Sequence, residues 1–192
     1  MMKFEKKWIN LPIKLKKILT KLLILLVIPT ISFAKNSIIN VTGFPTVIDG
    51  DTIKVNNFKI RFEGIDAPES YFKGKKQICY DKNKKKIYCG KMSKDILTKK
   101  IRGFKVDCKL TKKDRYKRFL GECYLKGESI SSYMVRSGYA FAYRRYSVKF
   151  IKDELYAKKN ELGLWSMQFE YPWLWRKQSK IQISLPPFII IR

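Results

Sequence analysis

The chain has 192 residues, of which 45% are hydrophobic, enough for one packed domain with a short extension. It contains 42 Lys and Arg residues against 16 Asp and Glu residues, a formal net charge of +26. This excess favours a polyanionic partner, either a nucleic acid or an anionic membrane surface, although a basic solubilising surface would give the same composition. The chain has no histidine, which excludes a Ser-His-Asp triad and any phosphodiesterase with a histidine nucleophile or base. Acid–base chemistry must therefore come from carboxylates, Lys, Tyr, Cys or metal-bound water.

The N-terminus has the pattern of an export signal. A lysine-rich stretch precedes an apolar core from Leu22 to Ile28, and Ser32-Phe33-Ala34 offers a small-x-small cleavage site. The apolar segment is shorter than the roughly 20 residues that span a bilayer. We therefore expect residues 1–34 to be a cleaved signal peptide and the protein to be periplasmic or secreted. The alternative is an uncleaved signal that anchors the protein to the membrane.

The β-rich runs are short. Residues 38–41 and 46–48 are β-rich, and further strands are predicted at 52–55, 58–62, 104–110 and 118–125. Asp49-Gly50 predicts a tight hairpin. The lysine-rich segment 73–90 is expected to be a surface loop.

Helices are predicted at 92–101, 128–136 and 147–161, with glycines near their ends. The apolar face of the last one is expected to include Ile151 and Leu155. Five short strands and about three helices predict a mainly β, α+β fold, a small five-stranded barrel of the OB type. We expect this domain to span residues 35–175.

Four cysteines follow the predicted signal: Cys79, Cys89, Cys108 and Cys123. An even number in an exported chain predicts two disulfides, with four free buried thiols as the alternative, and the absence of a Cys-x-x-Cys pair argues against zinc. Cys108 and Cys123 are equidistant from the centre of a predicted hairpin, so antiparallel strands would place them opposite each other. By exclusion, Cys79 would pair with Cys89.

Five polar residues are of the chemical types, carboxylate and guanidinium, that phosphodiester cleavage requires. They are Asp51, Arg61, Asp66, Glu69 and Arg118. Ca²⁺ takes oxygen ligands, polarises a phosphoryl oxygen and orients water, and paired arginines can bind two phosphate oxygens. Each residue also has a structural interpretation, since Asp51 follows a turn and Arg61 could pair with a nearby acid.

Longer motifs resemble the staphylococcal nuclease (thermonuclease) family. Residues 47–53 (VIDGDTI) and 61–69 (RFEGIDAPE) resemble its first signature, and residues 114–121 (DRYKRFLG) its second. Residues 134–140 and 163–165 match its C-terminal landmarks. The resemblance covers about residues 38–166, with its motifs in the right order. The tail, residues 176–192, lies outside it, and a strand, a docking segment or disorder all remain open there.

The resemblance implies an OB-fold, calcium-dependent nuclease that acts on DNA and RNA by in-line attack of water and leaves 3′ phosphates. Its site residues would be the metal ligands Asp51, Asp66 and the Ala67 carbonyl, the general base Glu69, the phosphate-binding Arg61 and Arg118, and the nucleotide-contacting Tyr116 and Tyr143. For the two tyrosines, packing around the barrel mouth is an equal alternative. Lys117 departs from the family's usual Gly, and could shift Arg118 if the turn needs a positive φ.

The competing function is a non-catalytic OB domain that binds nucleic acid. A degenerate binder would be free to lose its catalytic side chains, yet all five expected polar residues are present, which favours the enzyme. We expect a monomer with DNA and RNA as its partners, no evident protein partner, and membrane association only through residues 1–34.

Overall fold

A computed structural model describes residues 38–184 together with the isolated residue 12. The predicted signal peptide, apart from that one position, lies outside the described residues, as do residues 185–192. Side chains are described as far as Ser179.

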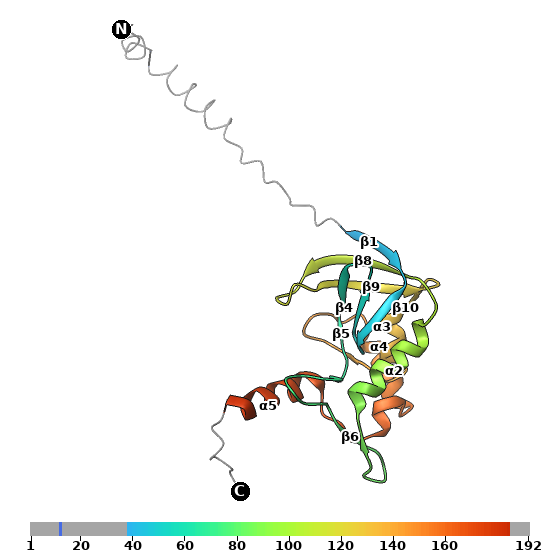
Figure 1. The fold of residues 1–192 in the computed structure, drawn as a ribbon, viewed down its shortest axis with the longest axis vertical. Coiled ribbons are helices and arrows are strands. Elements are labelled where there is room, and N and C mark those ends of the chain that lie inside the picture. Colours follow the sequence, from blue (N-terminus) through green and yellow to red (C-terminus); the bar gives the residue numbers. More distant parts are fainter. Residues whose placement is uncertain (1–11, 13–37, 185–192) are drawn as a thin grey trace. The chain divides into compact units, whose positions relative to one another are not determined.

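A curled seven-stranded sheet forms the barrel (Figure 1). Its strands are β1 (Ile39–Gly43), β2 (Pro45–Asp49), β3 (Thr52–Val55), β4 (Phe58–Phe62), β8 (Val106–Lys113), β9 (Phe119–Leu125) and β10 (Glu128–Ser129). They follow the order β1-β8-β9-β4-β3-β2, with β10 paired to β9, and only the β4–β9 pair among these is parallel. The expected OB-type fold is confirmed. The sheet has seven strands rather than five because β1 and β2 are separate and β10 adds a short edge.

The barrel interior is filled by apolar side chains that alternate along these strands. Those almost inaccessible to solvent include Ile53, Val55, Ile60, Phe62, Val106 and Leu110. Alternation places every second residue on the same face of a strand, so the polar residues between them lie outside the core. In β4 this pattern buries Ile60 and Phe62 and leaves Arg61 at the barrel surface.

Two small β-pairs lie outside the main sheet. β5 (Ile65–Asp66) pairs with β11 (Phe141–Ala142), and β6 (Cys79–Tyr80) pairs with β7 (Lys86–Ile87). The expectation of a plain surface loop over residues 73–90 was therefore incomplete. A hairpin forms within it, and Cys79 is fully buried.

Four α-helices and a short 3₁₀ helix complete the described chain (Figure 1): α2 (Cys89–Ile101), α3 (Ile130–Arg136), α4 (Ile151–Lys159), η1 (Gly163–Ser166) and α5 (Pro172–Ser184). The first three α-helices fall within or close to the predicted ranges. Helix α5 was not anticipated, and it crosses position 175, where the sequence analysis had ended the domain. Pro172 suits its first position, because the missing N–H of proline has no intrahelical partner there.

The predicted apolar face of α4 was partly wrong. Leu155 is 53% exposed, whereas Glu154 is 5% exposed. The Glu154 carboxylate accepts a hydrogen bond from Ala142 N at 3.0 Å and forms an ion pair with Arg144 at 2.7 Å. A buried charge of this kind is tolerated because it is paired and hydrogen-bonded.

Both predicted disulfides are present, Cys79–Cys89 and Cys108–Cys123. The second joins residues that face each other in the β8–β9 register, as the hairpin argument required. No helix within residues 38–184 is long and apolar enough to cross a membrane.

Candidate active site

Two buried aspartates share one guanidinium group. Arg61 Nη1 donates to Asp51 Oδ2 and Arg61 Nη2 donates to Asp66 Oδ1, both at 2.6 Å. Asp51 is 4% exposed and Asp66 is fully buried. The β3–β4 register, which sets Thr52 opposite Arg61, places Asp51 within reach of Arg61 at the start of β3. Charge-assisted hydrogen bonds of this length are among the strong ones in proteins.

Two further hydrogen bonds hold the Asp51 carboxylate in place. Thr52 Oγ1 donates to Asp51 Oδ1 at 2.8 Å, and Ala67 N donates to Asp51 Oδ2 at 3.2 Å. A Cβ on Gly50 would lie 2.8 Å from the Cβ atoms of Ala67 and Ser93. The glycine therefore lets the turn approach the Ala67 segment and helix α2 closely.

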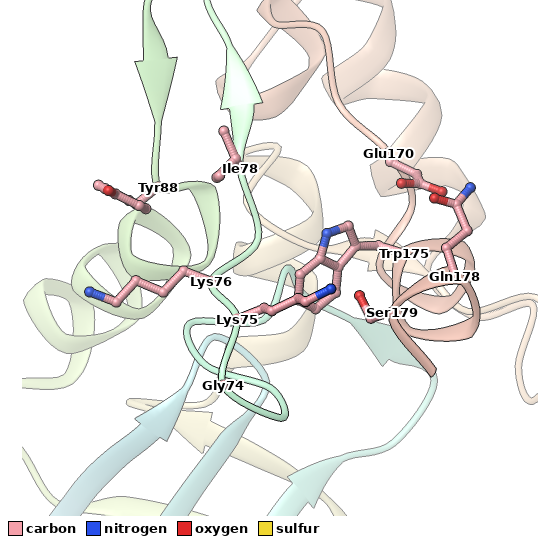
Figure 2. A pocket seen from close by; sticks show the side chains of 9 residues that line it. All are labelled: Gly74, Lys75, Lys76, Ile78, Tyr88, Glu170, Trp175, Gln178 and Ser179. Atoms are coloured by element: carbon pink, nitrogen blue, oxygen red, sulfur yellow. The ribbon is translucent and has the colours of Figure 1, made fainter. Parts of the chain in front are cut away.

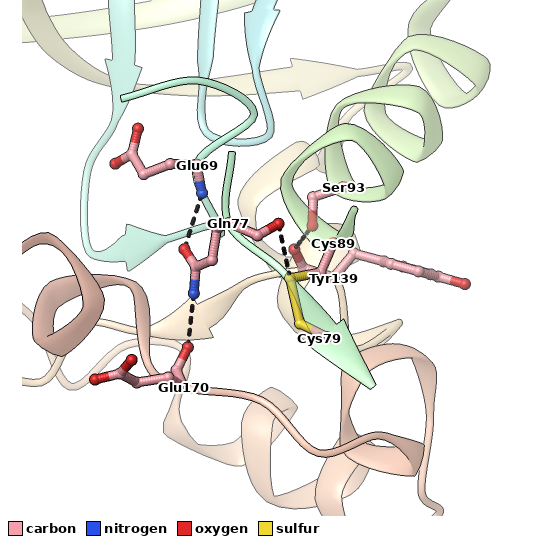
Figure 3. Close-up of a disulfide and its surroundings, with 7 residues drawn as sticks. All are labelled: Glu69, Gln77, Cys79, Cys89, Ser93, Tyr139 and Glu170. Carbon is pink, nitrogen blue, oxygen red and sulfur yellow. Dashed lines mark hydrogen bonds between the residues drawn. A yellow bond between two sulfur atoms is a disulfide. The ribbon is translucent and has the colours of Figure 1, made fainter. Parts of the chain in front are cut away.

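Glu69 is positioned through its main chain by a buried glutamine that sequence reasoning had missed. Gln77 is fully buried, accepts from Glu69 N at 3.1 Å and donates to Glu170 O at 2.7 Å (Figure 3). The Cys79–Cys89 disulfide lies beside it, with Cys89 Sγ 3.5 Å from Gln77 O. The disulfide and Gln77 thus hold the Glu69 backbone from one side.

Helix α2, which begins at Cys89, also contacts this segment. A Cβ on Gly90 would lie 2.0 Å from the Glu69 carbonyl oxygen, so the first turn of α2 contacts the Glu69 backbone directly. Glycine is the residue that permits this approach.

The second cation of the site is Arg176 of α5, which sequence reasoning also missed. Its Nη1 donates to Glu69 Oε1 at 2.6 Å, and its Nη2 donates to Asp66 Oδ2 at 2.7 Å. It lies 110 residues after Asp66 and outside the recognised motifs, so no local pattern pointed to it.

The site is crowded with negative charge. Burial, and then the charge of Asp51, raise the pKa of Glu69 to about 7, although Arg176 opposes this shift. Burial and the charge of Asp51 also raise the pKa of Asp49 to about 6. Burial raises the pKa of Asp66 despite its two arginines.

Asp51 shifts the other way. Burial opposes its ionisation, but Arg61 and the hydrogen bonds from Thr52 and Ala67 outweigh it and lower the pKa. Three carboxyl groups, those of Asp51, Asp66 and Glu69, therefore share two guanidinium groups, and Asp49 adds a fourth carboxyl group that accepts from backbone N–H groups.

Among the residues that the structure describes, no three Asp, Glu or Cys side chains are arranged as a metal-binding group. The side-chain oxygens of Asp66 both accept from guanidinium groups, and one oxygen of Glu69 accepts from Arg176.

Arg118 lies in the β8–β9 turn, apart from this network. Its Nε and Nη2 pair with Asp114 Oδ2 at 2.8 and 2.7 Å, and its backbone N donates to Asp114 Oδ1. Lys117 has φ of 62°, so the turn does require the left-handed conformation that glycine favours. The parallel pairing of Phe119 with Ile60 nevertheless places the start of β9, and with it the preceding turn residue Arg118, beside β4, the strand of Arg61.

The two predicted nucleotide-contacting tyrosines lie in different surroundings. Tyr116 is 58% exposed, with the Arg118 guanidinium 5.3 Å from its ring centre. Tyr143 is stacked on Trp173 of α5, with ring centres 5.3 Å apart and planes 8° from parallel. Tyr116 is thus accessible, whereas one ring face of Tyr143 is covered.

The structure thus defines an OB-fold protein with a candidate active site of buried carboxylates and adjacent guanidinium groups. The model of the family described as staphylococcal nuclease homologue matches residues 59–167. The chain belongs to the staphylococcal nuclease family, as its motifs indicated.

Individual relatives agree with this assignment. An Escherichia coli O157:H7 protein described as an uncharacterized endonuclease is 34% identical over 138 residues, which cover 68% of this chain and 80% of the relative. The succinoglycan biosynthesis protein ExoI of Rhizobium meliloti is 30% identical, covering 68% of each chain. The staphylococcal-like nuclease CAN1 of Arabidopsis thaliana is 31% identical over 68% of this chain and 36% of its own length.

Proposed function

We propose that this protein is a calcium-dependent nuclease that hydrolyses phosphodiester bonds within DNA and RNA and leaves 3′ phosphates. The observation that carries the proposal is the position of Glu69. It is a largely buried carboxyl group with a pKa of about 7, beside two buried aspartates and Arg61. A base with this pKa can accept a proton from water near neutral pH.

The residues of the site fit a calcium ion in their chemistry. Asp51, Asp66 and the Ala67 carbonyl would be its ligands, since calcium prefers carboxylate and backbone oxygens. Four carboxyl groups against two guanidinium groups leave negative charge that a divalent cation would neutralise. When bound, calcium would polarise a phosphoryl oxygen and orient the attacking water.

The side chains of the chain itself would divide the remaining work. Glu69 would take the proton of the attacking water as the new P–O bond forms. The bond to the 5′ oxygen would break with its electron pair going to that oxygen, which would take a proton from solvent. Arg61 and Arg118 would bind phosphate oxygens and stabilise the charge that develops on them. Tyr116, exposed beside Arg118, would contact the nucleotide.

The charge of the chain supports nucleic acid as the substrate. A formal net charge of +26 attracts a polyanion over long range. The two disulfides suit an oxidising compartment, and we propose that residues 1–34 direct export. N-terminal sequencing of the extracellular or periplasmic protein would test cleavage after Ala34.

We expect the full chain to cleave plasmid DNA and RNA with Ca²⁺, and to lose activity when EGTA removes the ion. Mg²⁺ should support less turnover, because it demands stricter octahedral geometry. Product end groups, analysed by phosphatase sensitivity, should be 3′ phosphates. Full activity in EGTA would refute the calcium assignment. Tight binding of single strands without cleavage would instead favour the non-catalytic OB domain.

We further expect the two disulfides to differ in their effect on catalysis. Replacing either pair by alanines should lower the free energy of unfolding by roughly 3 kcal/mol, because each closes a loop of similar size. The Cys79→Ala/Cys89→Ala variant should also lower kcat, since that bond lies against Gln77, which holds the Glu69 backbone. The Cys108→Ala/Cys123→Ala variant is the matched control. Equal kcat values, measured where both variants are folded, would contradict the positioning role.

A further inference from the structure

Helix α5 places the guanidinium of Arg176 at the carboxylates that would bind calcium in the proposed function. Arg176 makes ion pairs with Asp66 at 2.7 Å and with Glu69 at 2.6 Å, and its side chain is only 19% exposed. Asp66 has no accessible surface, and both of its oxygens accept from guanidinium groups. The positive charge of Arg176 thus compensates the same carboxylates that would bind a divalent ion.

We propose that Arg176 is an internal competitor of the metal ion, so that docked α5 holds the enzyme in a latent form and metal binding requires Arg176 to leave Asp66 and Glu69. The proposal rests on the calcium-dependent function above and adds a regulation of the same site. A guanidinium and a divalent cation on one carboxylate repel each other, and the repulsion is strong at a site with little water. Arg176 and the ion therefore compete for Asp66, while Arg61, which also pairs with Asp66, would bind a phosphate oxygen in the proposed function.

A second contact of α5, independent of the charges, supports this inference. Trp173 stacks on Tyr143 with nearly parallel rings, and on its other neighbour Tyr171 with ring centres 4.6 Å apart. A nucleobase would bind an exposed aromatic ring by stacking in this way. Helix α5 thus covers both the acidic cluster and an aromatic surface next to it.

The way α5 is held is compatible with its release. Its start is tied to the domain by the Gln77 side chain, which donates to Glu170 O. Further along, the helix borders a pocket of about 540 Å³ that Trp175 and Ser179 line from the helix and Gly74 lines from the facing loop (Figure 2). Arg176 is one of several contacts that hold the helix, together with the aromatic pairs of Trp173 with Tyr143 and of Trp175 with Phe72.

The test is calcium affinity, measured by isothermal titration calorimetry on the full chain without substrate. Arg176→Met retains an unbranched side chain but removes the charge. We expect this variant to bind Ca²⁺ with a Kd about 5- to 150-fold lower, the usual range of coupling between two bound groups. Lys177→Met is the matched control, because Lys177 is the exposed next residue of the same helix, and its Kd should equal the wild-type value.

Two further measurements protect the test against a misfolded variant. Trp173→Ala weakens docking without touching the carboxylates, and should also tighten the Kd. In the wild-type protein, amide hydrogen exchange of residues 172–179 should increase when Ca²⁺ is added, because the helix is released.

The outcomes separate the two proposals. Calcium binding with the same or weaker affinity in Arg176→Met, and unchanged exchange in α5, would overturn the competition and leave the nuclease proposal intact. Absence of calcium binding in the wild-type chain and in the Arg176→Met and Trp173→Ala variants would overturn the metal assignment as well.

Discussion

Replacement of Glu69 by Gln should lower kcat for DNA cleavage by about 10²–10⁴ while the affinity for DNA changes little. The amide retains the size of the side chain and an oxygen that can still accept from Arg176, but it cannot take a proton from water. Burial makes ionisation of the Glu69 carboxyl group unfavourable, so the free energy of unfolding of the variant should be at least that of the wild type. Single-turnover cleavage and DNA binding, measured separately, give the two quantities.

Glu161→Gln is the control for this experiment. Glu161 is exposed and pairs with Lys82 on the surface, so its loss should leave kcat unchanged. If Glu69→Gln cleaves DNA at the wild-type rate, another group supplies the base and the assignment of the site is wrong.

Replacement of Arg61 by Met should lower the free energy of unfolding by about 3–5 kcal/mol and abolish cleavage. Arg61 joins two aspartates whose side chains are 5% and 0% exposed, and its removal leaves both short of a partner. The cost arises mainly from buried carboxylates that lose their counter-charge. Urea denaturation in EGTA measures it, because bound calcium would mask part of the loss.

Arg118→Met provides the comparison. Its partner Asp114 belongs to the same turn and, at 15% side-chain exposure, is less buried than Asp51 and Asp66, so breaking that pair should cost about 1 kcal/mol. Its kcat should nevertheless fall, if Arg118 binds phosphate in the transition state. An Arg61→Met variant as stable as Arg118→Met would show that the buried network does not depend on Arg61.

The sequence by itself determined those features that depend on local pattern. Short runs of β-forming residues predicted the strands of the barrel, and the placement of Cys108 and Cys123 around one turn predicted their disulfide, which the β8–β9 register confirms. The motif around Asp51 and the one from Arg61 to Glu69 identified the family and most of the acidic cluster. The sequence could indicate this part of the site because its residues are close together in the chain and lie in neighbouring strands and one turn.

Only the tertiary structure decided which distant groups complete the site. Gln77 became a support for Glu69 through a buried hydrogen bond, and Arg176 reached Asp66 from a helix 110 residues further along the chain. In α4, Leu155 faces solvent and Glu154 is buried against Arg144, although helical periodicity favoured the reverse. Charge pairing and burial in these cases depend on what the rest of the chain packs against each residue, and that information is absent from the spacing of residues in any one segment.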